Sequence, residues 1–263
     1  GTTRTNSHPE VEMTTTRRTA IGLVAAAFIF TWIFSGLMSM NPLGVFSSTR
    51  EAMDSGRYRG GTVAVDGALG EPAALLAAVD DARFKPVEIQ WRRIDGELFA
   101  VLLDGQGETR IVSGSDGHLQ VARLLPAAWL QQKVRALSDA PVQGYWAQHA
   151  ADAYFYPRAP EAMNGAAVRR FPVAVADFDD AEATRVYLDL ATGDPLLTMG
   201  RRERVGRWLF HFLHSWDLPA MLRQVTARLA VLLLLSLAGA ALCATATVIG
   251  YRRLRMKLRR RRR

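Results

Sequence analysis

The segment RWLFHFLHSWDLP, residues 207–219, holds the residues whose types and spacing come nearest to a site for chemistry. His211 and His214 lie three positions apart, so on a helix they share one face and could both approach one metal ion or a haem iron. A metal site usually takes three or four ligands, and Asp217 is the candidate third ligand. The pattern therefore raises His211 and His214 as cofactor ligands, with Asp217 as a further metal ligand.

A simpler interpretation makes residues 207–217, here called the collar, the place where a folded domain meets a membrane. Aromatic rings settle at the headgroup level of a bilayer, and histidine is amphipathic enough to sit there too. The aromatic residues of the collar are Trp208, Phe210, Phe212 and Trp216. A haem b in a bilayer generally takes two axial ligands, commonly histidines on facing helices. Neither long apolar run of the chain contains a histidine, so we favour the collar, with haem b as the cofactor of the alternative.

The other candidate residues give weaker signals. Four carboxylates cluster between two predicted strands: Asp177, Asp179, Asp180 and Glu182. Such a cluster can hold Ca²⁺, but its spacing does not match the calcium-loop pattern, and a solvated hairpin turn explains it. His118, His149 and Asp152 have no recognisable partner spacing. The chain has no phosphate loop and no G-x-S-x-G elbow, so we assign no catalytic residue.

Two long uncharged runs of the chain flank the candidate residues and should position them. Residues 20–40 (21 residues) and 229–251 (23 residues) each reach the length of about 20 residues that a helix needs to cross a bilayer core. A buried core helix is the alternative for each run. The first run is too long for a secretory signal, and no A-x-A site follows it. We therefore predict uncleaved transmembrane helices over residues 19–41 and 229–251.

Basic residues near both ends predict the orientation. Arg17 and Arg18 precede the first span, and residues 252–263 carry nine basic groups and no acid. The positive-inside rule then makes residues 1–18 and 252–263 cytoplasmic tails and exports the part between the spans to the periplasm. Subtracting the +9 of the second tail and the +1 of the first from the total of +8 leaves −2 for the rest. The folded part therefore has no basic surplus for nucleic acid, and we expect the tail to attract anionic membrane lipid.

The second span is rich in small residues, several of them at four-residue spacing, such as Ser236, Ala240 and Ala244. Small residues let another helix approach closely in lipid, and that helix is either the first span or a span of a partner protein. The only cysteine, Cys243, lies in the same span, so the chain can form no intrachain disulfide.

The part between the spans has the pattern of an α+β domain. In residues 42–120 we expect a short helix and then an antiparallel meander. The expected helix and strands lie at residues 72–82, 87–93, 97–103 and 109–112. Asp95-Gly96 joins the first two strands and is a strong hairpin signal, and Asp116-Gly117 follows the third strand.

A second unit of similar order is expected over residues 121–206. Pro126 fits the start of its helix. The helix and strands of this unit are expected at residues 127–137, 153–156, 171–178 and 184–188. The fold class is therefore an α+β membrane protein, in which two transmembrane helices flank two helix-plus-antiparallel-sheet units, with a juxtamembrane helix over residues 207–228.

Four stretches, in this order, resemble PepSY-associated transmembrane proteins. They are FIFTWIFSGLMSMNPLG (28–44), RVYLDLATGDPL (185–196), RWLFHFLHSWDLP (207–219) and LLLLSLAGAALCATATVIGYRRLR (232–255). Residues 71–117 are a looser PepSY-like unit. Two features depart from the family. Relatives often carry histidines just before the first span, where this chain has Thr16, Arg17 and Arg18, and the chain begins with Gly1, which is consistent with a piece of a longer protein.

The resemblance implies a bacterial inner-membrane protein with periplasmic PepSY-type units. Such domains are associated with peptidase inhibition or protein binding, and longer relatives with siderophore uptake and ferric-siderophore reduction, some using haem. We expect a non-catalytic accessory protein that binds a membrane or periplasmic protein partner in iron or siderophore uptake. The alternatives are a haem- or metal-dependent ferric-siderophore reductase subunit and a regulator or inhibitor of a periplasmic peptidase.

Overall fold

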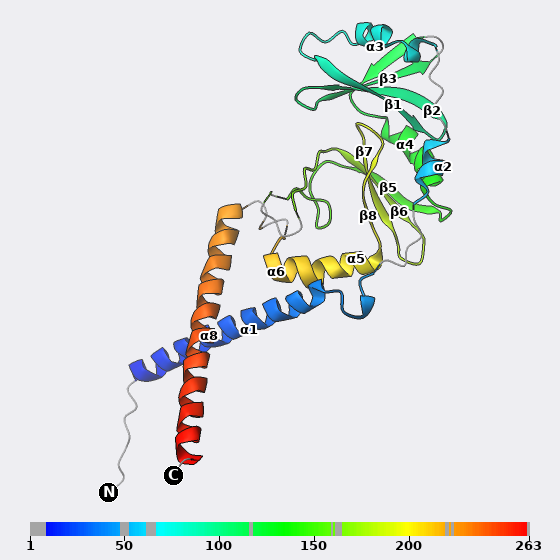
Figure 1. Ribbon diagram of the computed structural model, residues 1–263. Helices are drawn as coiled ribbons and strands as arrows, with labels where there is room; N and C mark the ends of the chain where they lie inside the picture. Colours follow the sequence, from blue (N-terminus) through cyan, green and yellow to red (C-terminus); the bar gives the residue numbers. More distant parts are fainter. Residues whose placement is uncertain are drawn as a thin grey trace. The chain divides into compact units, whose positions relative to one another are not determined.

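The computed structural model describes residues 9–47, 53–61, 67–115, 118–158, 160, 165–218, 221 and 224–261. The chain divides into two compact units, drawn in Figure 1. Unit 1 combines both ends of the chain, Gly1–Phe46 and Val205–Arg263, and holds the long helices. Unit 2, Ser47–Arg204, holds the sheets.

Two four-stranded antiparallel sheets form unit 2, each with its strands in sequence order (Figure 1). The first sheet consists of β1 (Pro86–Ile94), β2 (Glu97–Asp104), β3 (Thr109–Ser115) and β4 (His118–Ala122). The second consists of β5 (Val142–Gln148), β6 (Val173–Phe178), β7 (Arg185–Asp189) and β8 (Pro195–Met199). The short helices are α2 (Ser55–Arg59), η2 (Gly67–Gly70), α3 (Pro72–Ala78), α4 (Ala127–Lys133), η3 (Val134–Leu137) and α5 (Arg201–Gly206), which crosses the boundary to unit 1. The predicted α+β class is confirmed.

Strand β2 explains how the first sheet is buried on both faces. Successive side chains of a strand point to opposite faces, so Phe99 and Val101 lie on one side and Ala100 and Leu102 on the other. All four are buried. Phe99 and Val101 share a core with buried residues of α4, η3 and the second sheet, whereas Ala100 and Leu102 pack against Leu75 of α3. A strand covered on both faces reads as a continuous apolar run rather than an alternating one.

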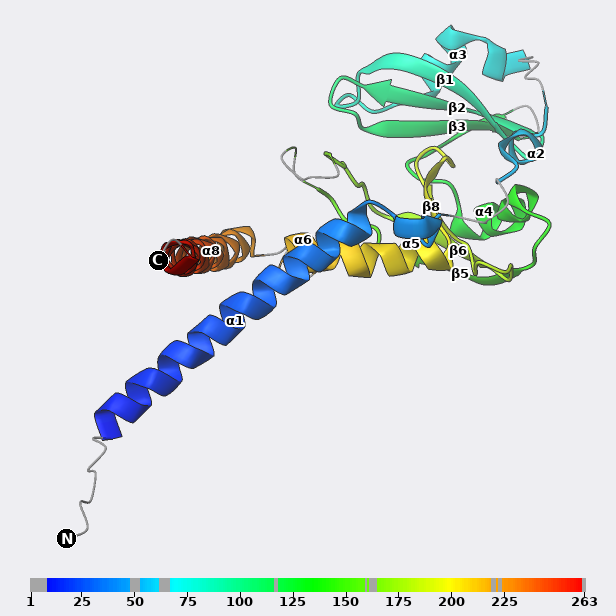
Figure 2. The same ribbon diagram turned by 60° about the horizontal axis from the view of Figure 1, so that its bottom comes forward.

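The inner core therefore belongs to both sheets. It includes Ile94, Ile111, Leu130, Val134, Leu137, Ala174, Ala176, Phe178, Val186 and Leu188. The opposite face of the second sheet carries its own smaller cluster, in which Phe155 stacks on Tyr187 with ring centroids 4.9 Å apart. Figure 2 shows β1, β2 and β3 side by side, with α3 beside their sheet.

Local signals located the first sheet better than the second. The Asp95-Gly96 hairpin is confirmed, with φ of 48° and 83°, values that suit Asp and Gly. The meander has a fourth strand, β4, which the sequence interpretation missed, and the Asp116-Gly117 signal lies outside the described residues.

The strand predicted at residues 153–156 is wrong. The backbone there bends because the Asp152 carboxylate accepts hydrogen bonds from the amides of Tyr154 and Phe155, at 2.8 and 2.5 Å. Phe155 is buried against the sheet instead of forming part of it, and the partly buried Tyr154 packs on the same cluster. Strands β5 and β8, which the sequence interpretation missed, occupy the two edges of that sheet.

Unit 1 contains two helices long and apolar enough to cross a membrane. Its elements are α1 (Pro9–Ser39), η1 (Pro42–Gly44), the π-helix η4 (Arg207–Phe212), α6 (Leu213–Ser215) and α8 (Val225–Arg261). Only 17% of the candidate span Gly22–Ser39 and 6% of Val225–Arg260 is buried in the protein, whereas a core helix of a soluble protein would be mostly buried. Figure 2 shows α1 as one continuous helix. Gly239 of α8 packs against Ile29 of α1, since an added Cβ would lie 3.3 Å from the Ile29 side chain.

Candidate functional site

The collar is a helical segment with an unusual turn and an unusual end. Arg207–Phe212 forms a π-helical turn, a rare geometry that often marks functional segments. The helix ends at Trp216, which adopts the left-handed conformation with φ 50° and ψ 42°. A bulky residue in that conformation costs roughly 1–2 kcal/mol. The edge-on contact of Trp216 with Phe28 of α1, with ring centroids 5.9 Å apart, helps to hold it there.

A buried ion pair closes the collar. Arg207 Nη1 lies 3.1 Å from Asp217 Oδ1, and Arg207 Nη2 donates to the Asp217 carbonyl at 2.8 Å. Their side chains are only 4% and 9% exposed. The Arg207 guanidinium also lies 5.0 Å from the centroid of the Trp208 ring. The pair therefore ties the first residue of the π-helix to the residue after Trp216, at which the helical segment ends.

His214 is held by α1. Its Nδ1 lies 3.1 Å from the Ser35 hydroxyl, and its carbonyl accepts from Trp32 Nε1 at 3.0 Å. The Ser35 hydroxyl donates its proton to the Trp32 carbonyl, at 3.0 Å, so it can only accept from the imidazole. The tautomer with its proton on Nδ1 satisfies this contact, and in that tautomer the lone pair lies on Nε2. Trp32 stacks on the ring at a centroid distance of 5.6 Å.

In the structure, each of the three predicted ligands contacts a different neighbour. Asp217 faces Arg207, His214 faces Ser35, and His211 lies beside Phe210 at a centroid distance of 5.0 Å. Within the described residues, no three His, Cys, Asp or Glu side chains gather as a metal site would require. In the collar, the contact with Ser35 orients the imidazole of His214. Ligand roles for His211 and His214 stay a prediction.

The contacts of Ser35 and Trp32 with His214 were not predicted from the sequence, in which both residues simply lie within the first apolar run. A serine in such a run is itself a signal, because a polar group in lipid needs a partner.

Carboxylates of the acidic cluster at residues 177–182 form ion pairs and hydrogen bonds within the fold. Asp177 makes a two-point contact with Arg185, at 2.7 and 2.8 Å. Asp180 accepts from the Thr184 amide at 2.8 Å. Glu182 is only 7% exposed and pairs with Arg202 at 3.3 Å, so the expectation of a solvated turn is wrong for this residue. Asp152, the other unplaced carboxylate, accepts from the Tyr187 hydroxyl at 2.8 Å.

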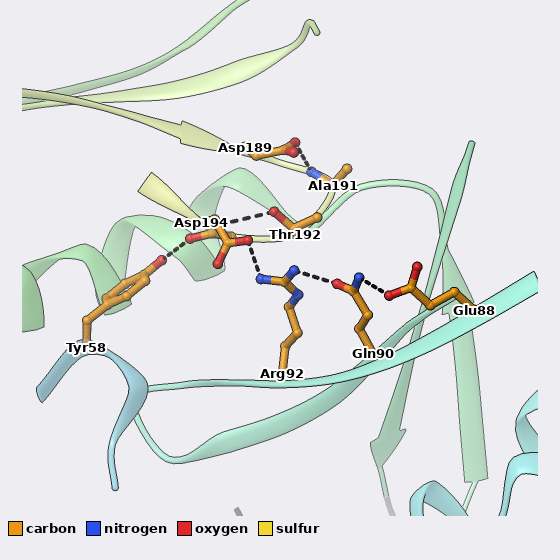
Figure 3. A network of polar contacts seen from close by, with 9 residues as sticks. Tyr58, Glu88, Gln90, Arg92, Asp189, Ala191, Thr192 and Asp194 are labelled. Atoms are coloured by element: carbon orange, nitrogen blue, oxygen red, sulfur yellow. Dashed lines mark hydrogen bonds and ion pairs between the residues drawn. The ribbon is translucent and has the colours of Figure 1, made fainter. Parts of the chain in front are cut away.

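A polar network in unit 2 joins the first sheet to the β7–β8 turn (Figure 3). The Tyr58 hydroxyl donates to the Gly193 carbonyl at 2.8 Å, and the Arg92 guanidinium pairs with Asp194. Arg92 also donates to Gln90, and Gln90 to Glu88, at 2.5 and 2.6 Å. Tyr58 and Gly193 are 135 positions apart and Arg92 and Asp194 are 102 apart, and no sequence pattern linked either pair.

Gly193 makes this junction possible. Its φ is +76°, and an added Cβ would lie 2.1 Å from the Ile94 side chain and 3.2 Å from that of Leu125. Glycine alone brings the turn this close to the first sheet, and it does so without strain.

A cleft of about 380 Å³ opens beside this network. Its walls include Tyr58, Arg59, Trp91, Arg92, Arg93, Thr192 and Asp194. Burial, and after it the nearby Asp194 carboxylate, raises the pKa of Tyr58 above its usual range, so this hydroxyl stays protonated as a donor. The cleft thus combines guanidinium groups, an indole and hydroxyls, which suit recognition of a ligand that carries carboxylate or other acceptor oxygens.

Replacing Tyr58 with phenylalanine should cost about 1–2 kcal/mol of unfolding free energy, because the buried Gly193 carbonyl loses its donor. Thermal or urea unfolding of the purified chain, followed by near-ultraviolet circular dichroism, measures this loss.

Tyr145→Phe is the matched control. The Tyr145 hydroxyl is buried without a partner among the described residues, so its removal should leave stability unchanged or raise it slightly. Burial also raises the pKa of Tyr145 to about 12. The unfolding free energy that is linked to protonated Tyr145 is therefore fully present below pH 10 and is lost as the pH rises toward 12. This alkaline loss of stability should vanish in the phenylalanine variant. Equal losses in both variants at neutral pH would contradict the assignment.

Comparison of the chain with protein-family models, with curated proteins and with solved structures finds no match. The PepSY resemblance therefore rests on the four quoted stretches.

Proposed function

We propose that the chain is a membrane-anchored binding protein of PepSY type, an accessory to iron or siderophore uptake. Its two long helices cross a bacterial inner membrane, both termini lie in the cytoplasm, and unit 2 faces the periplasm. The apolar helices α1 and α8 support the anchoring. The four quoted stretches support the PepSY and siderophore assignments, and the basic residues beside each span support the orientation.

The cleft beside Arg92 is the observation that carries the binding function. Arg59 is exposed at its rim, on the last turn of α2. Arg92 is held in place by Asp194 and Gln90, and its Nε is buried without a partner among the described residues. Positioned guanidinium groups recognise carboxylates and similar groups by two-point hydrogen bonding. The partner that this chemistry suits is a protein segment with acidic side chains.

The basic C-terminal end of α8 would bind the anionic surface of the membrane. Residues 252–260 continue the helix and are exposed throughout. Each basic residue close to anionic lipid contributes about 1 kcal/mol to binding. Membrane lipid is therefore the second proposed partner.

Cross-linking on intact spheroplasts tests orientation and cleft together. A membrane-impermeant, amine-reactive reagent added outside should join unit 2 to its partner. Arg59→Glu should lower the yield of that product about tenfold, equivalent to about 1.4 kcal/mol, because it reverses a charge at the cleft. Arg135→Glu, the same change at an exposed arginine of η3 outside the cleft lining, should leave the yield unchanged.

Two outcomes would contradict the proposal. Equal yields from both variants would remove the cleft from the binding function. A product formed only in inside-out vesicles would reverse the orientation.

The alternative of a reductase subunit draws on one observation, the fixed imidazole of His214 with its lone pair on Nε2. It requires ligands beyond those that the described residues bring together. A haem absorption band of the purified chain that disappears in His214→Ala and survives in His211→Ala would favour this function. A peptidase regulator differs from the main proposal in the identity of the partner that the cross-link would capture.

A further inference from the structure

Strand β5 is an open edge that lacks most of the usual protection. It is the outermost strand of the second sheet, and among the residues that the structure describes it pairs only with β6. Its sequence, VQGYWAQ, has no charged residue and no proline, and its one bulge lies at the start, between Val142 and Gly144. Natural proteins usually protect an edge with charges, proline, bulges or a short strand.

The other three edges carry such protection. Strand β1 contains Glu88, Arg92 and Arg93, β8 begins with Pro195, and β4 has only five residues. β5 is therefore the edge best suited to accept another strand.

The ladder of the second sheet tells which groups of β5 point outward. The Phe178 amide donates to Thr184 at 2.8 Å, so Phe178 directs its backbone groups toward the strand that follows. Directions alternate along an antiparallel strand, so Asp177, Val175 and Val173 direct theirs toward β5. Their partners there are Gly144, Trp146 and Gln148. The residues between these, Tyr145 and Ala147, therefore present their amide and carbonyl groups at the open edge.

We propose that two copies of the chain pair antiparallel through β5, with Trp146 of one copy opposite Trp146 of the other. In this register Tyr145 of each copy faces Ala147 of the other, and each such pair exchanges both backbone hydrogen bonds. The two Trp146 residues form the close pair between them, where aromatic side chains on one face stabilise a sheet. The two second sheets then continue as one.

Charge favours a second copy as the occupant. Trp146 is 38% exposed, and the Arg185 guanidinium lies 5.0 Å from its ring centroid. Arg185 is neutralised by its two-point contact with Asp177. β5 itself carries no charge, and the Arg185–Asp177 pair beside Trp146 is balanced, so pairing two copies of β5 places no like charges on the two strands opposite each other. An acidic partner, as proposed for the cleft, would find no complementary charge here.

The small contact area of the edge implies that two copies pair in the membrane rather than in solution. Seven residues span about 23 Å, and a sheet is about 10 Å thick, so the contact covers on the order of a few hundred Å². A stable soluble dimer needs roughly 1,200 Å² or more. Anchoring both copies in one membrane raises their effective concentration and supplies the difference. The inference thus rests on the proposed anchoring but not on the cleft or its partner.

Disulfide trapping of the full chain in native membranes tests the register. The background carries Cys243→Ala, so that each variant has one cysteine. Trp146→Cys should form a disulfide dimer on mild oxidation, because Cα atoms of a close pair lie about 4.5 Å apart, within bonding range. Ala147→Cys is the matched control on the same exposed strand. The Cα atoms of residue 147 in the two copies would lie about 8 Å apart, which is beyond that range, and their side chains point to the other face of the sheet. We therefore expect at least tenfold less dimer from this variant.

A proline tests the backbone contact. Ala147→Pro removes an outward amide without breaking the ladder to β6, a position where edge strands tolerate proline. Added to Trp146→Cys, it should lower the dimer yield at least tenfold, whereas Ala147→Ser should not. Co-purification of two differently tagged copies with native Trp146 provides a second measurement, which the proline should also abolish.

The proposal fails if Trp146→Cys gives no dimer and the tagged copies do not co-purify. It also fails if both cysteine variants dimerise within twofold of each other, or if Trp146→Cys bonds to a different protein. None of these results depends on the Arg59→Glu experiment, so the two proposals can fail separately.

Discussion

Replacing Asp217 with leucine should destabilise the collar by about 3–5 kcal/mol, the largest loss that we expect from a single substitution. Arg207 would remain buried without its partner carboxylate, and its side chain is only 4% exposed. Its hydrogen bond to the backbone carbonyl of residue 217 would remain, but no carboxylate at that position would offset the cost of burying its charge. The Trp216 conformation, which the ion pair helps to enclose, should be lost together with it.

Trypsin cleavage after Arg207 measures this effect directly. The buried Arg207 is protected while the collar is closed, and cleavage follows the population of the open form. A loss of 3 kcal/mol or more should raise the cleavage rate about 100-fold or more.

Two further variants separate a lost ion pair from a lost side chain. Arg207→Met combined with Asp217→Leu should recover most of the stability, because apolar residues often replace a buried pair without loss. Asp139→Leu breaks the exposed pair with Arg57, where Asp139 is 89% exposed, and should cost less than about 1 kcal/mol. If Asp217→Leu behaved like Asp139→Leu, the buried pair would not close the collar.

Gly60→Ala should cost unit 2 about 2–4 kcal/mol. Gly60 ends α2 in the left-handed conformation, with φ 74°, and its amide donates to the Gly56 carbonyl at 3.0 Å. An added Cβ would lie 2.4 Å from the backbone nitrogen of Gly96, in the β1–β2 turn. The conformation accounts for about 1 kcal/mol and the collision for about 1–3 kcal/mol, because a backbone atom cannot move aside like a side-chain end.

Gly61→Ala is the matched control for this collision. Gly61 also has a positive φ, +90°, but nothing lies within 4 Å of an added Cβ. It should therefore show only the conformational cost, about 1 kcal/mol. Urea unfolding of both variants, followed by circular dichroism, compares the two. Equal midpoints would show that α2 does not rest on the Asp95-Gly96 turn.

The Arg92–Asp194 and Tyr58–Gly193 contacts of the candidate site could not be predicted from the sequence. Arg92 lies in a strand that already reads as amphipathic, and Thr192-Gly193-Asp194 reads only as a turn. Their meeting depends on the shared core that holds the two sheets together. Only the collar gave a local signal, since its histidines and aromatic residues are close in sequence, and even there the partners on α1 came from the structure.

The sequence by itself determined the features that depend on neighbouring residues. Charge-free length located the two apolar helices, and Asp95-Gly96 located the first hairpin, because span length and turn chemistry are local properties. Tertiary structure decided which residues are strands at the sheet edges and which polar groups meet. β5 contains a glycine and little alternation, and it is a strand because β6 offers a ladder. Residues 153–156 have strand-forming side chains, yet Asp152 bends their backbone, so packing overrode local preference there.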